Sequence, residues 1–347
     1  MNINKKLFDK INSYFYNYNL EDNRTDIEHF LNYNIPVSSN LDTCYLNYDA
    51  IFDNRCNEAI EIINNIMLKH DKDGITPIIK NLAKVESGTR TYVRDHVVHA
   101  MLTFIVGIYI NENFFDNRKV EPFQWKLASL FHDIGYPIEI CSKHILKPFD
   151  DSVNDIRSLL GSPSNIIDFK INIPDNISKL TRKNSFDLIQ ECLNKWDIQI
   201  NVKEEYNQMI KKGQIRHGVI SSLLLLNAID LMYQEKHETE EKFNRIIVPA
   251  CSAIYIHDRE SKDFTKKINR SKAPIAFLLR LSDCLQEWER PKFKNPTGFL
   301  ATMFDIEATK NQLIYKYKFL DNDEIKNNIM KEILALEYQH QEIQINP

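Results

Sequence analysis

The chain has 347 residues, of which 43% are hydrophobic and 27% charged, as in an ordinary globular protein. This length allows one large domain or two smaller ones around a sizeable core. Only eight glycines are present, which argues against a β-sandwich or a glycine-rich nucleotide-binding fold and favours helices. The net charge of −4 gives no overall positive field for nucleic acid, so binding of nucleic acid would need a local basic groove and is not favoured.

Cysteine usage and hydropathy predict a cytoplasmic protein. The six cysteines are scattered without a Cys-x-x-Cys pair, and the first ten residues are polar. We therefore expect reduced thiols and no signal segment. The longest apolar runs, 97–110 and 219–229, are too short to cross a bilayer. We interpret them as buried core helices and expect no membrane association.

The first part of the chain is predicted to be helical. Residues 1–90 form an expected N-terminal lead-in, because apolar side chains recur at helical spacing over 59–68. A helix over 92–110 is apolar on nearly every face, which predicts a central position in the core. The next helix, 123–133, is expected to stop at Gly135-Tyr136-Pro137.

The rest of the chain is predicted to hold an insertion, further core helices and a small C-terminal unit. Residues 140–212 are polar and irregular, and we interpret them as an insertion that could cover a site. Alternating side chains predict a β-hairpin within 304–319, followed by a closing helix over 322–339. The other expected helices are 152–160, 186–196, 203–212, 215–233, 249–257 and 274–290. The predicted fold class is mainly all-α, in three parts: 1–90, 91–295 and 296–347.

Four histidines and two aspartates lie in or at the ends of the apolar helices: His99, His132, His217, His257, Asp133 and Asp283. A single histidine on such a helix is usually a hydrogen-bonded core residue, so the inference depends on the whole group. Asp283 lies in an apolar stretch, where an ionised carboxylate needs a cation, either Arg280 or a metal. Imidazole and carboxylate ligands suit Mn, Fe, Zn, Co, Ni or Mg, and these residue types do not distinguish among them.

The order of these residues resembles the HD superfamily of metal-dependent phosphohydrolases. The stretches Asp95-His96-Val97-Val98-His99-Ala100, Leu130-Phe131-His132-Asp133-Ile134-Gly135 and Leu279-Arg280-Leu281-Ser282-Asp283 are similar to its first, second and last motifs. Arg216-His217-Gly218 and Tyr255-Ile256-His257 are similar to segments that supply further histidines in members with two or more metals. The resemblance covers about residues 92–290, apart from the insertion.

This resemblance implies an all-helical bundle that hydrolyses a phosphoester of a nucleotide-like substrate with a metal-bound hydroxide. It implies that His99, His132, Asp133 and Asp283 hold one divalent metal ion. His217 and His257 would complete a second site, with Asp133 as the bridging ligand; if they are only core residues, the site holds one metal.

The first motif leaves two histidines to choose between. His96 and His99 lie three residues apart and share a helix face. We favour His99 as the ligand because the small residue Ala100 follows it, as in the family motif. His96 would then donate a proton to the leaving group or support the ligands.

The substrate stays open because this sequence departs from the family pattern. Many members have a lysine where Tyr136 stands, and the match of Gly135-Tyr136-Pro137 to the label of the HD-GYP cyclic-dinucleotide phosphodiesterases falls at a different position from theirs. Four cations near the motifs are candidates to contact substrate phosphate, with a solvated or ion-paired side chain as the alternative for each: Arg94, Lys143, Arg216 and Arg259. The alternatives are a non-catalytic nucleotide- or metal-binding module that signals to a partner protein, and a single-strand nuclease. The sequence predicts no oligomeric state.

Overall fold

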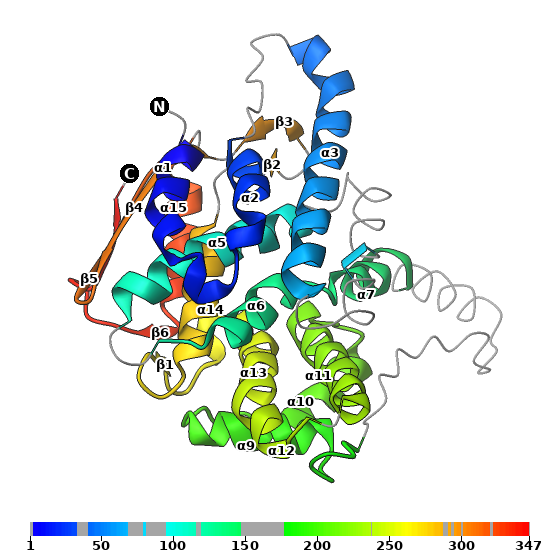
Figure 1. The fold of residues 1–347 in the computed structure, drawn as a ribbon. Coiled ribbons are helices and arrows are strands. Elements are labelled where there is room, and N and C mark those ends of the chain that lie inside the picture. The colour runs from blue at the N-terminus through cyan, green and yellow to red at the C-terminus, as the bar shows by residue number, and fades with distance from the viewer. Residues whose placement is uncertain are drawn as a thin grey trace, which may run out of the picture.

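The computed structural model describes residues 3–32, 41–68, 79–80, 95–115, 119–146, 177–236, 238–286, 291–292, 295–299, 301–319 and 322–346. The α-helices are α1 (Ile3–Ile11), α2 (Arg24–Leu31), α3 (Leu41–Leu68), α5 (His96–Phe114), α6 (Pro122–Phe131), α7 (Tyr136–Ile140), α9 (Ser185–Lys195), α10 (Val202–Lys212), α11 (His217–Glu235), α12 (Glu240–Lys242), α13 (Val248–His257), α14 (Pro274–Leu285) and α15 (Asn322–Ile333). The strands are β1 (Ile268–Asn269), β2 (Pro291–Lys292), β3 (Asn295–Phe299), β4 (Ala301–Thr309), β5 (Gln312–Phe319), β6 (Leu336–Glu337) and β7 (Ile343–Asn346). The fold is mainly helical, which confirms the predicted class (Figure 1).

The centre of the molecule is a group of five long helices. α5 packs against α6 and α14, while α13 packs against α6, α11 and α14. α5 is apolar on all sides and almost entirely buried, which confirms its predicted central position. By length and composition it is the one described helix that could span a membrane, but 83% of that stretch is buried inside the fold. We therefore assign it as a core helix.

Several helix ends differ from the predicted ones. Pro137 does not stop the chain after α6, because it occupies the first turn of α7, where a missing N–H costs nothing. α14 ends at Leu285 rather than at 290. α15 ends at Ile333 rather than at 339, and the chain then forms β6, which pairs in parallel with β1. Prolines and apolar periodicity locate a helix better than they locate its last turn.

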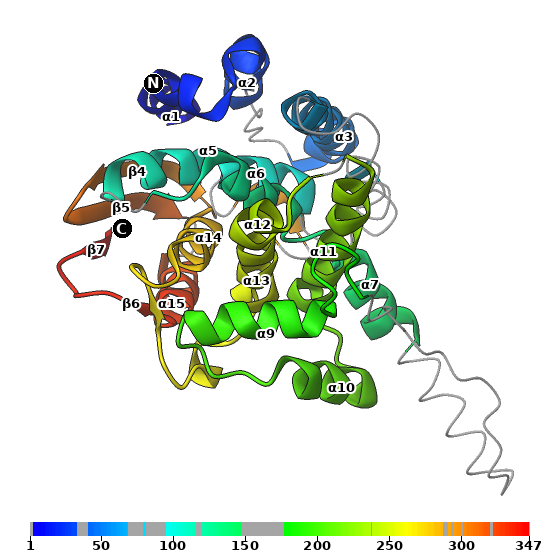
Figure 2. The ribbon, with the colours of Figure 1, turned by 60° about the horizontal axis from the view of Figure 1, so that its bottom comes forward.

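The described part of the predicted insertion is helical and packed. α9 and α10 are the helices expected over 186–196 and 203–212, and α9 packs against α13 (Figure 2). The side chains of Asn184 and Asn201 cap them by accepting N–H groups at 2.7 and 3.1 Å. The helix expected over 152–160 lies outside the described residues.

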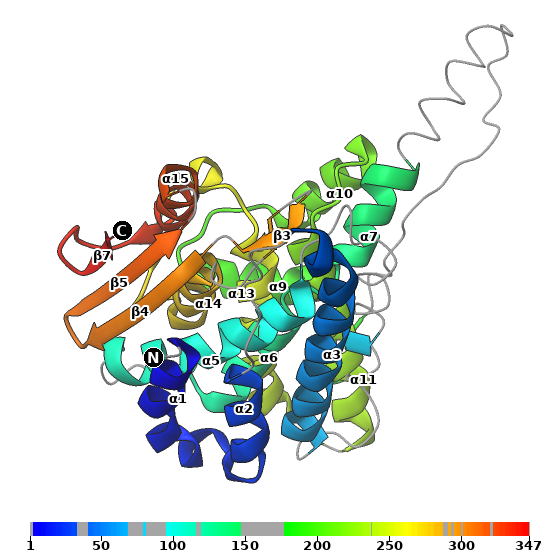
Figure 3. The same cartoon turned by 90° about the horizontal axis from the view of Figure 1, so that it is seen from above.

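The C-terminal unit contains the predicted hairpin and further strands that the sequence did not indicate, among them β7. β4 and β5 pair antiparallel, and β7 pairs in parallel with β5 (Figure 3). Tyr315 of β5 donates its hydroxyl to the carbonyl of Leu285 at 2.7 Å, which ties the sheet to the end of α14. Lys10 of α1 lies 2.8 Å from Asp305 of β4, so the N-terminal part packs on the same sheet. The five cysteines with described side chains are free thiols.

Candidate metal centre

Six side chains from five places in the fold meet at the ends of the central helices. His99 lies on α5, and His132 and Asp133 follow the last turn of α6. His217 is the first residue of α11, His257 is the last residue of α13, and Asp283 lies on α14. The structure thus brings together all six residues that the sequence predicts as metal ligands, in overlapping groups whose potential ligand atoms lie within 4.8 Å of one another.

The first group gathers around Asp283. The Nε2 atom of His99 lies 2.8 Å from Oδ1 of Asp283. The Nε2 atom of His132 lies 3.7 Å from the same oxygen and 3.4 Å from Oδ2 of Asp133. These four residues are the ones expected to hold the first metal.

The second group is a nearly regular triangle of ligand atoms. The Nε2 atoms of His217 and His257 are 3.2 Å apart, and they lie 3.3 and 3.5 Å from Oδ1 of Asp133. A metal about 2.0–2.2 Å from each ligand atom keeps neighbouring ligand atoms about 3.0–3.5 Å apart. The spacing of this triangle therefore fits one transition-metal ion.

Asp133 directs one carboxylate oxygen to each group. Its Oδ2 atom faces His132, and its Oδ1 atom faces His217 and His257. His132 and Asp133 can converge in this way because both lie beyond the last residue of α6, in the turn before α7. The carboxylate of Asp133 therefore lies between the two groups of imidazoles.

Each of the four histidines in the two groups has a hydrogen-bond partner at Nδ1 and turns its Nε2 atom toward the centre of the site. Nδ1 of His132 lies 2.8 Å from the carbonyl of Ser129, and Nδ1 of His257 lies 2.6 Å from the carbonyl of Ile254. The other two acceptors are side chains: Gln286 contacts Nδ1 of His99, and Glu139 lies 2.7 Å from Nδ1 of His217. We therefore assign the Nδ1–H tautomer to the rings of His99, His132 and His257, which leaves their Nε2 lone pairs for a ligand, while His217 directs its Nδ1–H to Glu139 and turns Nε2 toward the centre.

The contacts at the centre fit a bound cation. Lone pairs on Nε2 face carboxylate oxygens, and two acceptors attract each other only through a proton or a metal between them. His132 is fully buried, and its Nε2 atom has no hydrogen-bond partner among the described residues. Arg280 does not neutralise Asp283, because its guanidinium contacts the carbonyl of His257 and the side chain of Glu332. Of the two cations considered for Asp283, the geometry favours a metal.

Burial and charge set different protonation preferences within the centre. Burial lowers the pKa of His132 to about 4, so its imidazole is neutral and free to act as a ligand. Burial also opposes charge on His217, but the carboxylates of Asp258, Glu139 and Asp133 outweigh it and raise the pKa of His217 to about 9. Without a metal this ring therefore also carries a proton on Nε2, which a bound metal would displace. The pKa of Asp133 stays well below its ordinary value, because the imidazoles of His132 and His96 outweigh the effect of burial. Both aspartates that face the imidazoles are therefore ionised.

His96, the other histidine of the first motif, lies beside the two groups. Its Nδ1 atom is 2.7 Å from Oδ2 of Asp133, and its ring lies 3.7 Å from the ring of Tyr136. His96 thus contacts the proposed bridging carboxylate, while His99 contacts Asp283.

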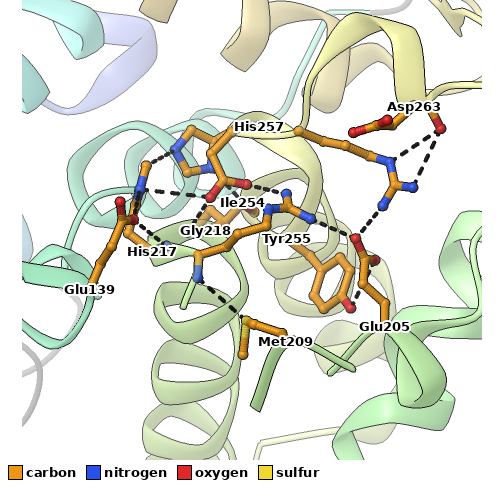
Figure 4. Close-up of polar contacts among 12 residues, drawn as sticks. Glu139, Glu205, Met209, His217, Gly218, Ile254, Tyr255, His257 and Asp263 are labelled. Carbon is orange, nitrogen blue, oxygen red and sulfur yellow. Dashed lines mark hydrogen bonds and ion pairs between the residues drawn. The ribbon is translucent and has the colours of Figure 1, made fainter. Parts of the chain in front are cut away.

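An open pocket of about 720 Å³ lies next to His217 and holds two of the four predicted phosphate-binding cations. Arg216 lies 2.6 Å from Oε1 of Glu205 and also contacts Asp258, while Arg259 contacts the same oxygen of Glu205 (Figure 4). Both guanidinium groups are therefore ion-paired within the chain. Lys143 does not line this pocket and is exposed, and Arg94 lies outside the described residues.

Some residues of the centre gave no signal in the sequence. Glu139 and Gln286 contact the histidine rings from positions without periodicity or motif. The sequence places Gly135 in a helix stop and in the second motif, but it does not indicate that a Cβ atom there would lie 2.5 Å from the carbonyl oxygen of His217. A glycine at this position lets the turn after α6 approach the start of α11.

Comparisons with known proteins leave the site to be interpreted from its own geometry. No protein-family model matches the chain, and no match was found among curated proteins or solved structures. The residues that support a functional assignment are therefore those of the two His/Asp groups and the pocket beside them.

Proposed function

We propose that this chain is a metal-dependent phosphohydrolase of the HD type that cleaves a phosphoester of a small, nucleotide-like substrate. One observation carries the proposal: four imidazole Nε2 atoms converge on the carboxylates of Asp133 and Asp283. This convergence agrees with the order of motifs that resembles the HD superfamily.

The two groups would hold two divalent metal ions. His99, His132, Asp133 and Asp283, which are joined by pairwise contacts, would hold one ion. Asp133, His217 and His257 would hold the other. When bound, such ions lower the pKa of water and neutralise charge on phosphoryl oxygens. The donor set of imidazoles and carboxylates suits Mn, Fe, Zn, Co or Ni better than Mg, which prefers oxygen ligands.

The protein's own groups would orient the reacting parts. Asp133 is held from one side by His96, whose Nδ1 atom lies 2.7 Å from its Oδ2 atom. We therefore assign His96 the task of fixing the bridging carboxylate, and not that of a ligand. Its contact with Asp133 also disfavours His96 as the direct proton donor to a leaving group.

The pocket beside His217 is the proposed substrate site. Its volume of about 720 Å³ falls within the usual range for small-molecule pockets. Its lining is mostly polar, with Arg216 and Arg259 opposite several carboxylates, among them Glu204, Glu205 and Glu260. A pocket lined in this way suits a compact polar substrate and disfavours a long polyanion such as single-stranded nucleic acid. It therefore argues against the alternative of a single-strand nuclease.

The proposal is tested by metal analysis of the purified protein and a turnover screen. The screen would cover nucleotides, cyclic nucleotides and simple phosphoesters with added Mn²⁺ or other divalent ions. The proposal predicts bound transition metal and hydrolysis of at least one compound. Protein without metal that hydrolyses none of them would contradict it.

A second candidate is a metal- or nucleotide-binding module without turnover. Two observations favour it: Tyr136 packs on His96 where many family members have a lysine, and the pocket arginines are already ion-paired. Calorimetric binding of a nucleotide without any product on chromatography would select this function.

A further inference from the structure

We infer that Glu139 is the positioning residue that prepares His217 to bind metal; this rests on the metal centre of the proposed function. One carboxylate oxygen of Glu139, Oε2, accepts two N–H groups of His217. The backbone N–H donates at 2.9 Å, and Nδ1 lies 2.7 Å away (Figure 4). The same oxygen therefore fixes both the start of α11 and the direction of the ring.

His217 needs such a partner because of its place in its helix. His132 and His257 each find an acceptor in the carbonyl three residues earlier. His217 is the first residue of α11, where no preceding turn supplies a carbonyl and the backbone N–H groups also lack helix partners. An acceptor from another element has to serve both groups, and Glu139 of α7 does so.

Packing alone does not hold the His217 ring. Its side chain is 18% exposed, while those of His99, His132 and His257 are at most 2% exposed. The ring also lines the open pocket. Of the four rings, His217 therefore depends most on its hydrogen bond.

Asp258 cannot take over this task. One of its oxygens lies 3.7 Å from Nδ1 of His217, beyond hydrogen-bond distance. That oxygen accepts the N–H of Gly218 at 3.0 Å, and the other contacts Arg216. Both oxygens of Asp258 therefore contact groups at the start of α11, and Glu139 is the acceptor for Nδ1 of His217.

The contact between Glu139 and His217 also connects the turn that carries Asp133 with the start of α11. Glu139 follows Asp133 along the chain, in the short helix that starts directly after the turn carrying that aspartate. The N–H of Gly135 in the same turn donates to Ser221 of α11 at 2.7 Å. Asp133 and the support of His217 therefore come from one continuous segment, 133–139, which is tied to α11 at Ser221.

The test uses the full chain and Mn²⁺ alone as the probe, with binding followed by calorimetry and electron paramagnetic resonance. Removing an acceptor behind a ligating histidine typically weakens metal binding about 10–100-fold. We expect Glu139→Ala to weaken the second Mn²⁺ site by this factor and to leave the first unchanged. Glu139→Gln keeps an oxygen acceptor and should restore most of the affinity.

Glu204→Ala is the matched control, because Glu204 lines the same pocket on α10 without contacting His217. It should bind two Mn²⁺ ions like the wild type. If Glu139→Ala also binds both ions with wild-type affinity, the positioning role is wrong. Equal weakening of both sites would likewise overturn it, because the effect would then come from the fold.

A second measurement does not depend on metal. Nitrogen-15 NMR of the His217 ring in the purified protein should show a hydrogen-bonded Nδ1–H that is lost in Glu139→Ala and kept in Glu204→Ala. A wild type that binds no metal would contradict the proposed function while this measurement still decides the role of Glu139. An unchanged His217 signal in Glu139→Ala would overturn it.

Discussion

Oδ1 of Asp133 lies 3.3 Å from Nε2 of His217, which joins the turn after α6 to the start of α11. The other oxygen of Asp133 lies 3.4 Å from His132, so the carboxylate stands between two groups of imidazoles. A carboxylate in this place either shares protons with its neighbours or bridges two cations. In the proposed function, the carboxylate of Asp133 bridges two metal ions.

The choice between His96 and His99 can be made by comparing the two alanine variants. His99 contacts Asp283 through Nε2, whereas His96 contacts Asp133 from outside the two groups. We expect His99→Ala to lose the first metal. His96→Ala should keep the metal but lower turnover, since Asp133 is less firmly held. Mass spectrometry of bound metal in both variants checks this, and metal loss confined to His96→Ala would reverse the assignment.

Metal binding should stabilise the fold, because the ligands come from α5, α11, α13, α14 and the turn after α6. A ligand that binds only the folded chain adds about 2.7 kcal/mol to the free energy of unfolding at about 100 times its Kd. We expect a higher melting temperature with added metal and a reversal by chelator. The melting temperature of His257→Ala should rise less on addition of metal than that of the wild type. A melting temperature that does not respond to either treatment would contradict a site shared by these helices.

Glu205 is expected to limit anion binding in the pocket. Its Oε1 atom contacts both Arg216 and Arg259, so neutralising it removes this carboxylate from Arg259 and one of two carboxylate partners from Arg216. Partly exposed pairs of this kind contribute up to about 1 kcal/mol, which corresponds to a roughly fivefold change in affinity. The Glu205→Gln variant should therefore be inhibited by lower concentrations of inorganic phosphate than the wild type. Glu204→Gln on the same helix is the control, and equal phosphate inhibition in both variants would exclude this role of the arginines.

Gly135 should tolerate no side chain. An added Cβ atom would lie 2.5 Å from the carbonyl of His217 and 2.8 Å from the amide nitrogen of Ser221. Gly135→Ala should lower the free energy of unfolding by about 1–3 kcal/mol and displace His217 from its partners. At Gly213, where no atom lies within 4 Å of an added Cβ, Asn should be tolerated because it adopts a positive φ readily. Denaturant unfolding of both variants checks the contrast, and equal stabilities would refute it.

The sequence predicted much of the core because apolar periodicity reports burial directly. α5, α6, α11 and α13 lie where the spacing of apolar side chains placed them, and their histidines sit at the helix ends. A polar residue inside or at the end of an apolar run stands out, so His99 and Asp283 could be identified as candidates. Their convergence became visible only with the packing of the helices.

Other features depend on contacts that no local pattern encodes. Glu139 and Gln286 look like ordinary polar residues, and only the tertiary structure shows that they support His217 and His99. β7 was missed because its parallel pairing with β5 depends on the chain returning to the sheet. Pro137 was misread because the same residue that ends one helix is suited to begin the next.

The most direct test of the central claim is the metal content and turnover of Asp133→Ala beside the wild type. Asp187→Ala serves as the control, since Asp187 is exposed on α9 and lies outside both the His/Asp groups and the pocket beside His217. Wild type and Asp187→Ala should carry two metal ions per chain and hydrolyse the same phosphoester. Asp133→Ala should lose both the metal and the activity while keeping its fold. A folded Asp133→Ala that retains wild-type metal and turnover would contradict the account.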